Sequence, residues 1–233
     1  MAKPAARTGR EGRRKIGAGV DRLLHERELL AAGHTLLAGL DEAGRGPLAG
    51  PVVAAAVMFP VAWLRQEFPA ELVDLNDSKQ LTESQREHYF AWLTARTEIR
   101  FAIAEADAGV IDRLNILRAT HRAMHDALAR LAPEPAHVLV DGLRVKSLRW
   151  PQTPLVKGDA RSYSIAAASV LAKVTRDRMM VAYDRQFPGY GFAEHKGYPT
   201  PAHLAALARL GPCAIHRRSF APLRAAQREF VLG

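Results

Sequence analysis

Residues 35–51 decide the fold, and they read TLLAGLDEAGRGPLAGP. The apolar run over residues 35–40 predicts a buried strand that ends at Asp41. A Gly/Pro-rich loop follows, and the apolar run over residues 51–58 predicts a second strand. Because this connection is too short for a helical crossover, we expect the two strands to lie side by side in a mixed sheet.

The rest of the chain interleaves strand and helix patterns. Further strands are expected over residues 99–103, 137–140 and 155–156, and helices over residues 21–32, 82–96, 112–131 and 163–185. The fold class is therefore α/β, with a mixed central sheet flanked by helices and a small C-terminal helical region. We expect a basic, partly flexible N-terminal extension (1–32), a main α/β domain (33–187) and a C-terminal helical and loop region (188–233).

Two of these helices carry specific expectations. The segment TESQ, residues 82–85, has the spacing of a capping box, in which Thr82 and Gln85 cap the helix start. In the helix over residues 112–131, four leucines recur at spacings compatible with one face. They are Leu114, Leu117, Leu128 and Leu131.

The composition favours a polyanionic partner. The 233 residues include 33 Lys and Arg against 24 Asp and Glu, a formal net charge of +9, although ribosome-associated, membrane-surface and plainly soluble proteins can be equally basic. The single cysteine, Cys213, excludes an internal disulfide and fits a reducing compartment. The apolar runs are too short to span a bilayer, so we expect no membrane partner and a cytoplasmic location.

Four carboxylates lie where the chain leaves predicted strands. They are Asp41, Glu42, Asp141 and Asp159. Carboxylates at neighbouring strand ends can form an oxygen-only cage suited to Mg²⁺ or Mn²⁺, although any one of them could instead be a turn or cap residue. In a regular strand Asp41 and Glu42 point to opposite faces, so a shared site requires a bend there. Gly44 and Gly46 make such a bend feasible.

A longer set of motifs adds a resemblance. The segment DEAGRGPLAGPV, residues 41–52, closely resembles the signature of the ribonuclease HII family. The likeness continues in order through NDSKQL (76–81), VDG (140–142), VKGD (156–159), AASVLAKVTRD (167–177) and HKGYPT (195–200), and it covers about residues 35–222. The first 30 or so residues lie outside it.

The resemblance implies a ribonuclease H-like fold and an endonuclease that hydrolyses the RNA strand of RNA/DNA hybrids. It makes residues 33–187 the catalytic domain and residues 188–233 the region that completes the substrate-binding cleft. It also implies nicking 5′ to ribonucleotides embedded in duplex DNA, with 5′-phosphate and 3′-hydroxyl products, in replication and repair. Asp41, Glu42, Asp141 and Asp159 would be catalytic and would hold two divalent ions, Mg²⁺ or Mn²⁺. The expected partners are hybrid and ribonucleotide-containing duplex, and the expected state is a monomer.

The resemblance also implies how substrate is read. Gly44, Arg45 and Gly46 resemble the loop that senses the ribose 2′-hydroxyl, where glycine lets backbone approach a ligand closely. Tyr198 resembles the tyrosine that packs against the deoxyribose on the 3′ side. Lys79 would contact a phosphate, although it can equally be a solvated lysine near a helix start. Arg45 can lie along the substrate backbone or brace the loop.

Several assignments stay open on sequence grounds. Lys157 and Arg161 could contact phosphates or balance the carboxylate cluster, and residues 216–218 (His216, Arg217 and Arg218) form a basic patch that could touch nucleic acid. Asp177 competes with Asp159 as the fourth carboxylate. We prefer Asp159, which lies just before the long helix, and expect Asp177 to pair with a neighbouring arginine, Arg176 or Arg178, or with solvent.

Two other functions compete with the leading one. The chain could bind hybrids without catalysis, which the intact carboxylate set argues against. It could also be another nuclease of the same fold, such as a resolvase or exonuclease, which the combination of Tyr198 with residues 44–46 disfavours.

Overall fold

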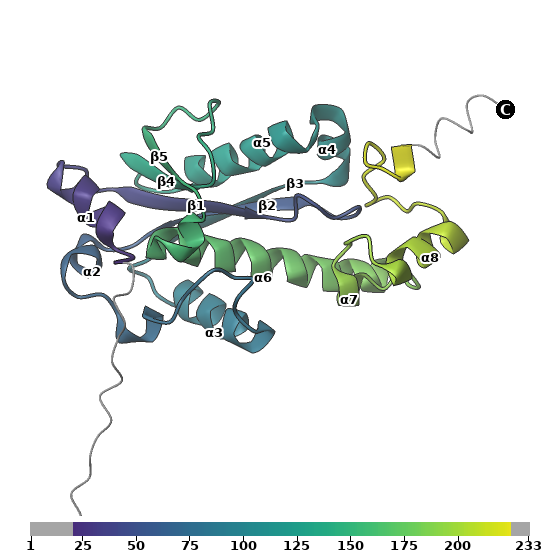
Figure 1. Ribbon diagram of the computed structural model, residues 1–233, viewed down its shortest axis with the longest axis horizontal. Helices are drawn as coiled ribbons and strands as arrows, with labels where there is room; N and C mark the ends of the chain where they lie inside the picture. Colours follow the sequence, from purple (N-terminus) through teal and green to yellow (C-terminus); the bar gives the residue numbers. More distant parts are fainter. Residues whose placement is uncertain (1–20, 225–233) are drawn as a thin grey trace, which may run out of the picture.

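A five-stranded mixed sheet forms the centre of the molecule (Figure 1). The structure, a computed structural model, describes residues 21–224, so residues 1–20 of the predicted N-terminal extension lie outside the described residues. The strands are β1 (Leu37–Ala43), β2 (Val52–Met58), β3 (Arg100–Ala106), β4 (His137–Asp141) and β5 (Gln152–Leu155), in the spatial order β3-β2-β1-β4-β5. The pairs β1–β2 and β2–β3 are antiparallel, and β1–β4 and β4–β5 are parallel.

The mixed sheet and the pairing of the first two strands are confirmed. The predicted end of the first strand is wrong, because β1 continues two residues past Asp41. Asp41 pairs with Ala55 and Glu42 pairs with Ala54 in regular antiparallel register. The backbone therefore does not bend between the two carboxylates. It turns at Gly44, whose φ of 93° lies in the left-handed region that glycine tolerates best.

Helices cover both faces of the sheet (Figure 1). One face packs against α6 (Tyr163–Gln186), with α1 (Leu24–Ala31), α2 (Val61–Arg65), the 3₁₀ turn η1 (Ala70–Leu72) and α3 (Glu83–Thr94) on the same side. The other face packs against α4 (Ala108–Leu114) and α5 (Ile116–Ala129). The turn η2 (Gly158–Ala160) precedes α6, and α7 (Phe192–His195) and α8 (Pro201–Leu210) follow it.

The single helix predicted over residues 112–131 is wrong. Asn115 has a φ of 69° and separates α4 from α5, and its side chain caps α5 by accepting from the Arg118 amide at 3.1 Å. The break changes which residues face the sheet. Leu117 is 51% exposed, while Ala119, Ala123 and Leu128 are fully buried. The leucine face inferred for one continuous helix therefore does not exist as such.

The capping box at α3 is confirmed. The Thr82 hydroxyl accepts from the Gln85 backbone amide at 3.2 Å, and the Gln85 side-chain oxygen Oε1 accepts from the Thr82 backbone amide at 2.9 Å. This start fixes the preceding segment over residues 76–81 beside α6. There the buried hydroxyls of Ser78 and Ser169 lie 2.9 Å apart. A segment remote in sequence is thereby joined to the helix beneath β1.

Helix α6 lies directly against β1. A Cβ placed on Gly39 would stand 2.1 Å from the carbonyl carbon of Ser164, so glycine is required for this contact. Ala167, Ala168 and Ala172 of the same helix are fully buried, as expected for a helix that packs closely on a sheet. The contact brings the next turns of α6 beneath the end of β1 that carries Asp41.

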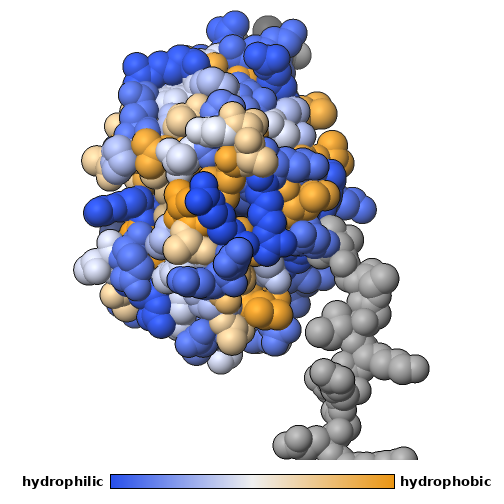
Figure 2. Space-filling model, turned by 90° about the vertical axis from the view of Figure 1, so that its left-hand side faces the viewer, coloured by the Kyte–Doolittle hydropathy of each residue, from blue (hydrophilic) through white to orange (hydrophobic). Residues whose placement is uncertain are grey.

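The outer parts of the chain pack onto this centre. Leu23, at the start of α1, and Leu30, within it, are buried in the same core as α6. The proposed division at residues 32 and 187 stays a prediction. Figure 2 views the molecule from the end where α1 and α2 lie, and hydrophilic residues cover most of that surface with apolar ones interspersed. Among residues 21–224, no helix has both the length and the apolar character needed to cross a bilayer.

Candidate active site

Asp41 and Asp141 lie side by side on two parallel strands, Asp141 at the end of β4 and Asp41 two residues before the end of β1. The register pairs Leu40 with Val140, so the next residue of each strand is an aspartate. Asp41 is 5% exposed, and burial together with the charges of Glu42 and Asp141 raises its pKa well above its ordinary value. One oxygen of Asp141 accepts from the Gly158 amide at 2.7 Å. The parallel pairing of β1 and β4 thus produces a repulsive carboxylate pair.

Glu42 follows Asp41 in a regular strand, where successive side chains alternate between the two faces, and it borders two cavities. One, of about 280 Å³, is also lined by Asp41, Lys79 and Tyr198. The other, of about 460 Å³, is also lined by Asp141. Burial raises the pKa of Glu42, although Arg45, whose Nη1 donates to Glu42 at 3.1 Å, opposes this shift. Glu42 therefore reaches the cluster from the rim without a backbone bend.

Asp159 joins the cluster from the turn before α6. Its carboxyl is buried and accepts from the Ala160 amide at 2.9 Å. Burial and the charges of Asp77 and Asp141 raise the pKa of Asp159 to about 6. Asp77 is a fifth carboxylate that the sequence prediction missed, although it lies in the quoted segment over residues 76–81. Its contact with Asp159 adds to the negative charge of the cluster.

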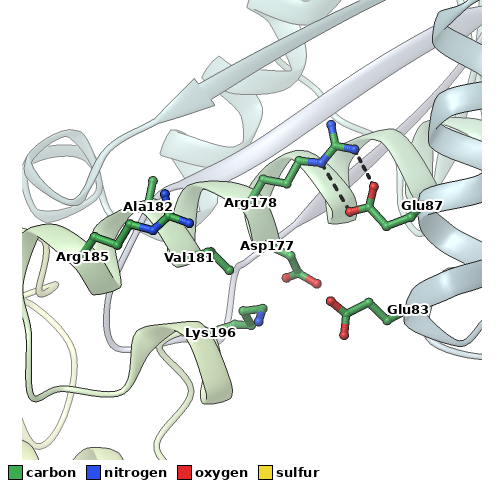
Figure 3. A pocket seen from close by; sticks show the side chains of 8 residues that line it. All are labelled: Glu83, Glu87, Asp177, Arg178, Val181, Ala182, Arg185 and Lys196. Carbon is green, nitrogen blue, oxygen red and sulfur yellow. Dashed lines mark hydrogen bonds and ion pairs between the residues drawn. The ribbon is translucent and has the colours of Figure 1, made fainter.

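Asp177, the competing fourth carboxylate, lies in a different cavity. That cavity, of about 250 Å³, lies between α3 and α6 and is also lined by Glu83 and Lys196 (Figure 3). The expected pairing of Asp177 with an adjacent arginine is wrong, because Asp177 accepts from Lys173 Nζ at 2.7 Å. Arg178 instead pairs with Glu87 (Figure 3).

Two buried arginines hold the loop over residues 44–51. Arg217 donates to the main-chain carbonyls of Gly44, Arg45 and Gly50 at 2.5, 3.0 and 2.9 Å. Arg176 donates to those of Ala49, Pro51 and Lys196 at 2.9–3.1 Å. Burial and the charge of Arg176 lower the pKa of Arg217 to about 9. Gly44 allows this packing, since a Cβ there would stand 2.0 Å from Arg176 Nε.

The basic patch predicted over residues 216–218 is largely wrong. His216 and Arg217 are 2% and 0% exposed, and Arg218 alone of the three lies on the surface. The two buried side chains act inside the protein, where His216 bonds to other residues of the C-terminal region and Arg217 to the loop. The main chain of Arg217 also donates to Leu48 at 2.8 Å, which ties the same segment to the loop.

The predicted substrate residues lie around the first cavity. Residues 44–46, Lys79 and Tyr198 all line it. Tyr198 is 43% exposed, and a Cβ on Gly46 would stand 3.7 Å from its ring. Lys79 is exposed, but the nearby protein partly desolvates its ammonium group, which by itself would lower its pKa. The carboxylates around it, Asp77 and Asp41 foremost, outweigh this effect and raise the pKa of Lys79. The structure therefore brings an aromatic ring and a cation to the carboxylate cluster.

The remaining basic candidates differ in their surroundings. Arg161 lies 3.1 Å from His25 Nε2 and donates to the Val156 carbonyl at 3.5 Å. Lys157 is exposed and has a left-handed backbone, with a φ of 56°. Arg161 is thus engaged within the protein, whereas the Lys157 side chain stands at the surface.

The donor set suits a hard divalent cation, because it consists of carboxylate oxygens that repel one another. As they stand, no three Asp, Glu, His or Cys side chains within residues 21–224 are arranged to hold one ion. Asp141 and Asp159 each bond to a backbone amide. Each of these carboxylates keeps a second oxygen for an ion, so binding would require the side chains to draw closer together but not to give up their amide bonds.

The fold and this cluster define a class: a nuclease built on the ribonuclease H fold. The sequence profile of the family described as Ribonuclease HII matches residues 38–223. The ribonuclease HII of Geobacter metallireducens is 54% identical over 188 residues, which cover 81% of this chain and 84% of that relative. The chain belongs to the ribonuclease HII family, and it is an endoribonuclease of the ribonuclease H type.

Solved structures agree with this assignment. The ribonuclease H2 of Pyrococcus horikoshii has a TM-score of 0.68 at 26% identity, covering 84% of this chain and 99% of that one. A structure of Bst-RNase HIII in complex with Mn²⁺ has a TM-score of 0.58 at 18% identity, covering 84% of this chain and 70% of that one. The second likeness shows the fold alone. The predicted α/β ribonuclease H-like fold is thereby confirmed.

Proposed function

We propose that this ribonuclease H is a metal-dependent endonuclease whose catalytic and metal-binding residues are Asp41, Glu42, Asp141 and Asp159. The carrying observation is the mutual repulsion of these carboxylates, in which Asp141 contributes to the raised pKa of each of the other three. A cluster of this kind is costly without a counter-charge, and bound cations would relieve it. The Mn²⁺ complex of a ribonuclease HIII with the same fold supports this choice.

The protein supplies position and charge to the reaction. Divalent ions, when bound, supply Lewis acidity and neutralise charge at the scissile phosphate. Asp41 and Asp141 offer oxygens from adjacent strand ends, Glu42 reaches in from the rim, and Asp159 comes from the turn before α6. Mg²⁺ and Mn²⁺ both suit such donors, and two ions would match the number of carboxylates.

We propose that residues 44–46 and Tyr198 read the ribonucleotide and its 3′ deoxyribose. The support is their placement around one cavity with the carboxylates, and the firm hold of buried arginines on the loop. The enzyme would then cut the RNA strand of hybrids and nick 5′ to single ribonucleotides in duplex DNA, leaving 5′-phosphate and 3′-hydroxyl ends. Lys79 would contact a substrate phosphate, because the carboxylates that now surround it would bind the ions instead.

We further propose that the enzyme acts in replication and repair, as a cytoplasmic monomer that removes ribonucleotides from DNA. These parts of the proposal rest on family membership and on the basic composition, which favours a polyanionic substrate.

The test uses a DNA duplex with one embedded ribonucleotide, incubated with the protein and Mg²⁺, Mn²⁺ or chelator. An all-DNA duplex of the same sequence is the control. We expect one cut 5′ to the ribonucleotide with either ion and none with chelator. A cut that resists chelator would contradict metal dependence, and equal cutting of the control would contradict ribose recognition. Full activity of Asp141→Asn would contradict the assigned ligands.

A further inference from the structure

Three histidines of the C-terminal region gather in a buried cluster beside Tyr198. His203 and His216 are 0% and 2% exposed, and their ring centroids lie 5.3 Å apart. His195 stacks on His203 with centroids 4.4 Å apart. Phe192 and Tyr190 pack against the same rings. The cluster belongs to no cavity of the carboxylate site, and the chemistry proposed above does not use it.

The hydrogen bonds fix which nitrogen carries each proton. His203 Nδ1 lies 2.9 Å from the Tyr198 carbonyl oxygen, which can only accept, so Nδ1 carries a proton. His203 Nε2 then accepts from His216 Nε2 at 3.1 Å. His216 Nδ1 is left as an acceptor, and it takes the Cys213 amide proton at 3.0 Å. A one-way chain of donors thus runs from Cys213 to the backbone of Tyr198.

His195 holds the other side of the same segment. Its Nε2 donates to the Tyr190 carbonyl at 2.8 Å, and its Nδ1 accepts from the Gly197 amide at 3.1 Å. The Tyr198 amide donates to the His195 carbonyl at 2.9 Å. The backbone amide and the carbonyl of Tyr198 are therefore both tied to histidines.

The donor chain requires neutral imidazoles. A proton added to His203 or His216 would set two N–H groups against each other. Burial, the other histidines and Arg218 lower the pKa of His216 to about 4, and burial lowers that of His203. The chain therefore stays intact at neutral pH. Because the inward nitrogens are all used, the cluster serves as a structural link to Tyr198.

We propose that His203 and His216 are positioning residues that hold Tyr198 against the substrate, and so set the preference for a single embedded ribonucleotide over a continuous hybrid. This inference rests on the proposed role of Tyr198. Neither histidine touches substrate. Both act through the Tyr198 carbonyl, and Leu48, which donates to the Gly197 carbonyl at 2.8 Å, aligns the segment with the loop over residues 44–51.

The test compares kcat/KM for a duplex with one ribonucleotide and for a continuous RNA/DNA hybrid. The ratio of the two is the readout, because the fraction of active enzyme cancels. In His216→Asn, the amide oxygen can still accept from Cys213 but cannot reach His203. We expect the ratio to fall about fivefold, the effect of one lost buried hydrogen bond. The matched control is His125→Asn, at a half-buried histidine on α5 outside the histidine cluster, which should leave the ratio unchanged.

The same change in a Tyr198→Ala background decides how the histidine acts. We expect His216→Asn to leave the ratio of Tyr198→Ala unchanged, because the ring that it positions is gone. An unchanged ratio in the single variant, or a further fall in the double variant, would overturn the inference. An inactive wild-type chain would overturn the proposed function as well, and equal ratios for wild type and Tyr198→Ala would remove the role of Tyr198.

A second pair of variants serves if His216→Asn does not fold. In His203→Asn, the amide nitrogen is as many bonds from Cα as Nδ1 and can still donate to Tyr198. His203→Leu removes the donor. We expect the kcat/KM ratio of His203→Asn to be at least threefold higher than that of His203→Leu. The loss of one hydrogen bond should lower the ratio about fivefold, so a difference of this size is within reach. Equal ratios in the two variants would overturn the inference.

Discussion

Arg217 donates from Nη1 to the main-chain carbonyl of Arg45 at 3.0 Å, so one arginine fixes the backbone of another across 172 positions of sequence. Nε and Nη2 of the same guanidinium donate to the main-chain carbonyls of Gly50 and Gly44. A buried cation is therefore satisfied by carbonyl dipoles of the loop that we propose reads the ribose. The loop conformation depends on the planar, forked shape of this side chain.

Arg217→Lys should loosen that loop, because a single ammonium cannot serve three separated carbonyls. We expect a loss of about 2–4 kcal/mol in the free energy of unfolding, measured by urea titration. Discrimination between ribonucleotide-containing duplex and all-DNA duplex should fall with it. Arg149→Lys is the control, since Arg149 is exposed and pairs with Glu134. An Arg217→Lys protein as stable as the wild type would contradict this account.

Asp159→Asn should stabilise the metal-free protein at neutral pH. The pKa of Asp159 in the folded protein is about 6, above its ordinary 3.8, so its contribution to stability is full below about pH 4 and is lost as pH rises through 6. In chelator at pH 7.5 the variant should gain about 1–3 kcal/mol over wild type. At pH 4 the gain should largely vanish, and an equal gain at both pH values would contradict the shift.

Metal binding should separate Asp159 from Asp177. We expect Mn²⁺ to raise the melting temperature of the wild type and of Asp177→Asn, but not of Asp159→Asn or Asp141→Asn. Asp141→Asn should also lower kcat by more than about 100-fold, since even outer partners of metal ligands contribute 10–100-fold. Differential scanning fluorimetry and single-turnover cleavage measure the two effects. A lost shift in Asp177→Asn alone would reverse the assignment.

Tyr198→Ala should impair cleavage at a single ribonucleotide more than cleavage of a long hybrid. The ring would contact the deoxyribose that follows an embedded ribonucleotide, a feature that a continuous hybrid lacks. We expect about a tenfold loss on the first substrate, the size of a lost aromatic stacking contact. Tyr198→Phe keeps the ring and should behave like wild type. Equal losses on both substrates would contradict the assigned role.

The sheet was predictable because its signal is local. The apolar runs around residues 35–58 and the short loop between them specify paired strands, and Thr82 with Gln85 specify a helix start. The break at Asn115 was not predictable from apolar spacing. A single residue with positive φ leaves the hydrophobic period almost unchanged, yet it rotates the following helix and exposes Leu117.

The candidate site, like the fold, was predictable from the sequence only in part. The carboxylates of residues 41, 141 and 159 were predictable because each follows a strand pattern in its own segment. Buried Arg217 and His216 were not, since adjacent basic residues are usually exposed. Their partners lie far along the chain or are main-chain carbonyls, which no side-chain pattern reveals. Asp77 was missed for a related reason, as its neighbour Asp159 is 82 positions away.

Gly39 fixes how closely α6 lies against β1. Where α6 rests on β1 through Gly39 and Ser164, main chain meets main chain, so atomic radii fix the separation of the two elements. This contact also sets the distance between Asp41 and the residues of α6 that lie beneath it. The distance across the floor of the cleft is thereby set by the sheet and α6 and not by the loops at its rim.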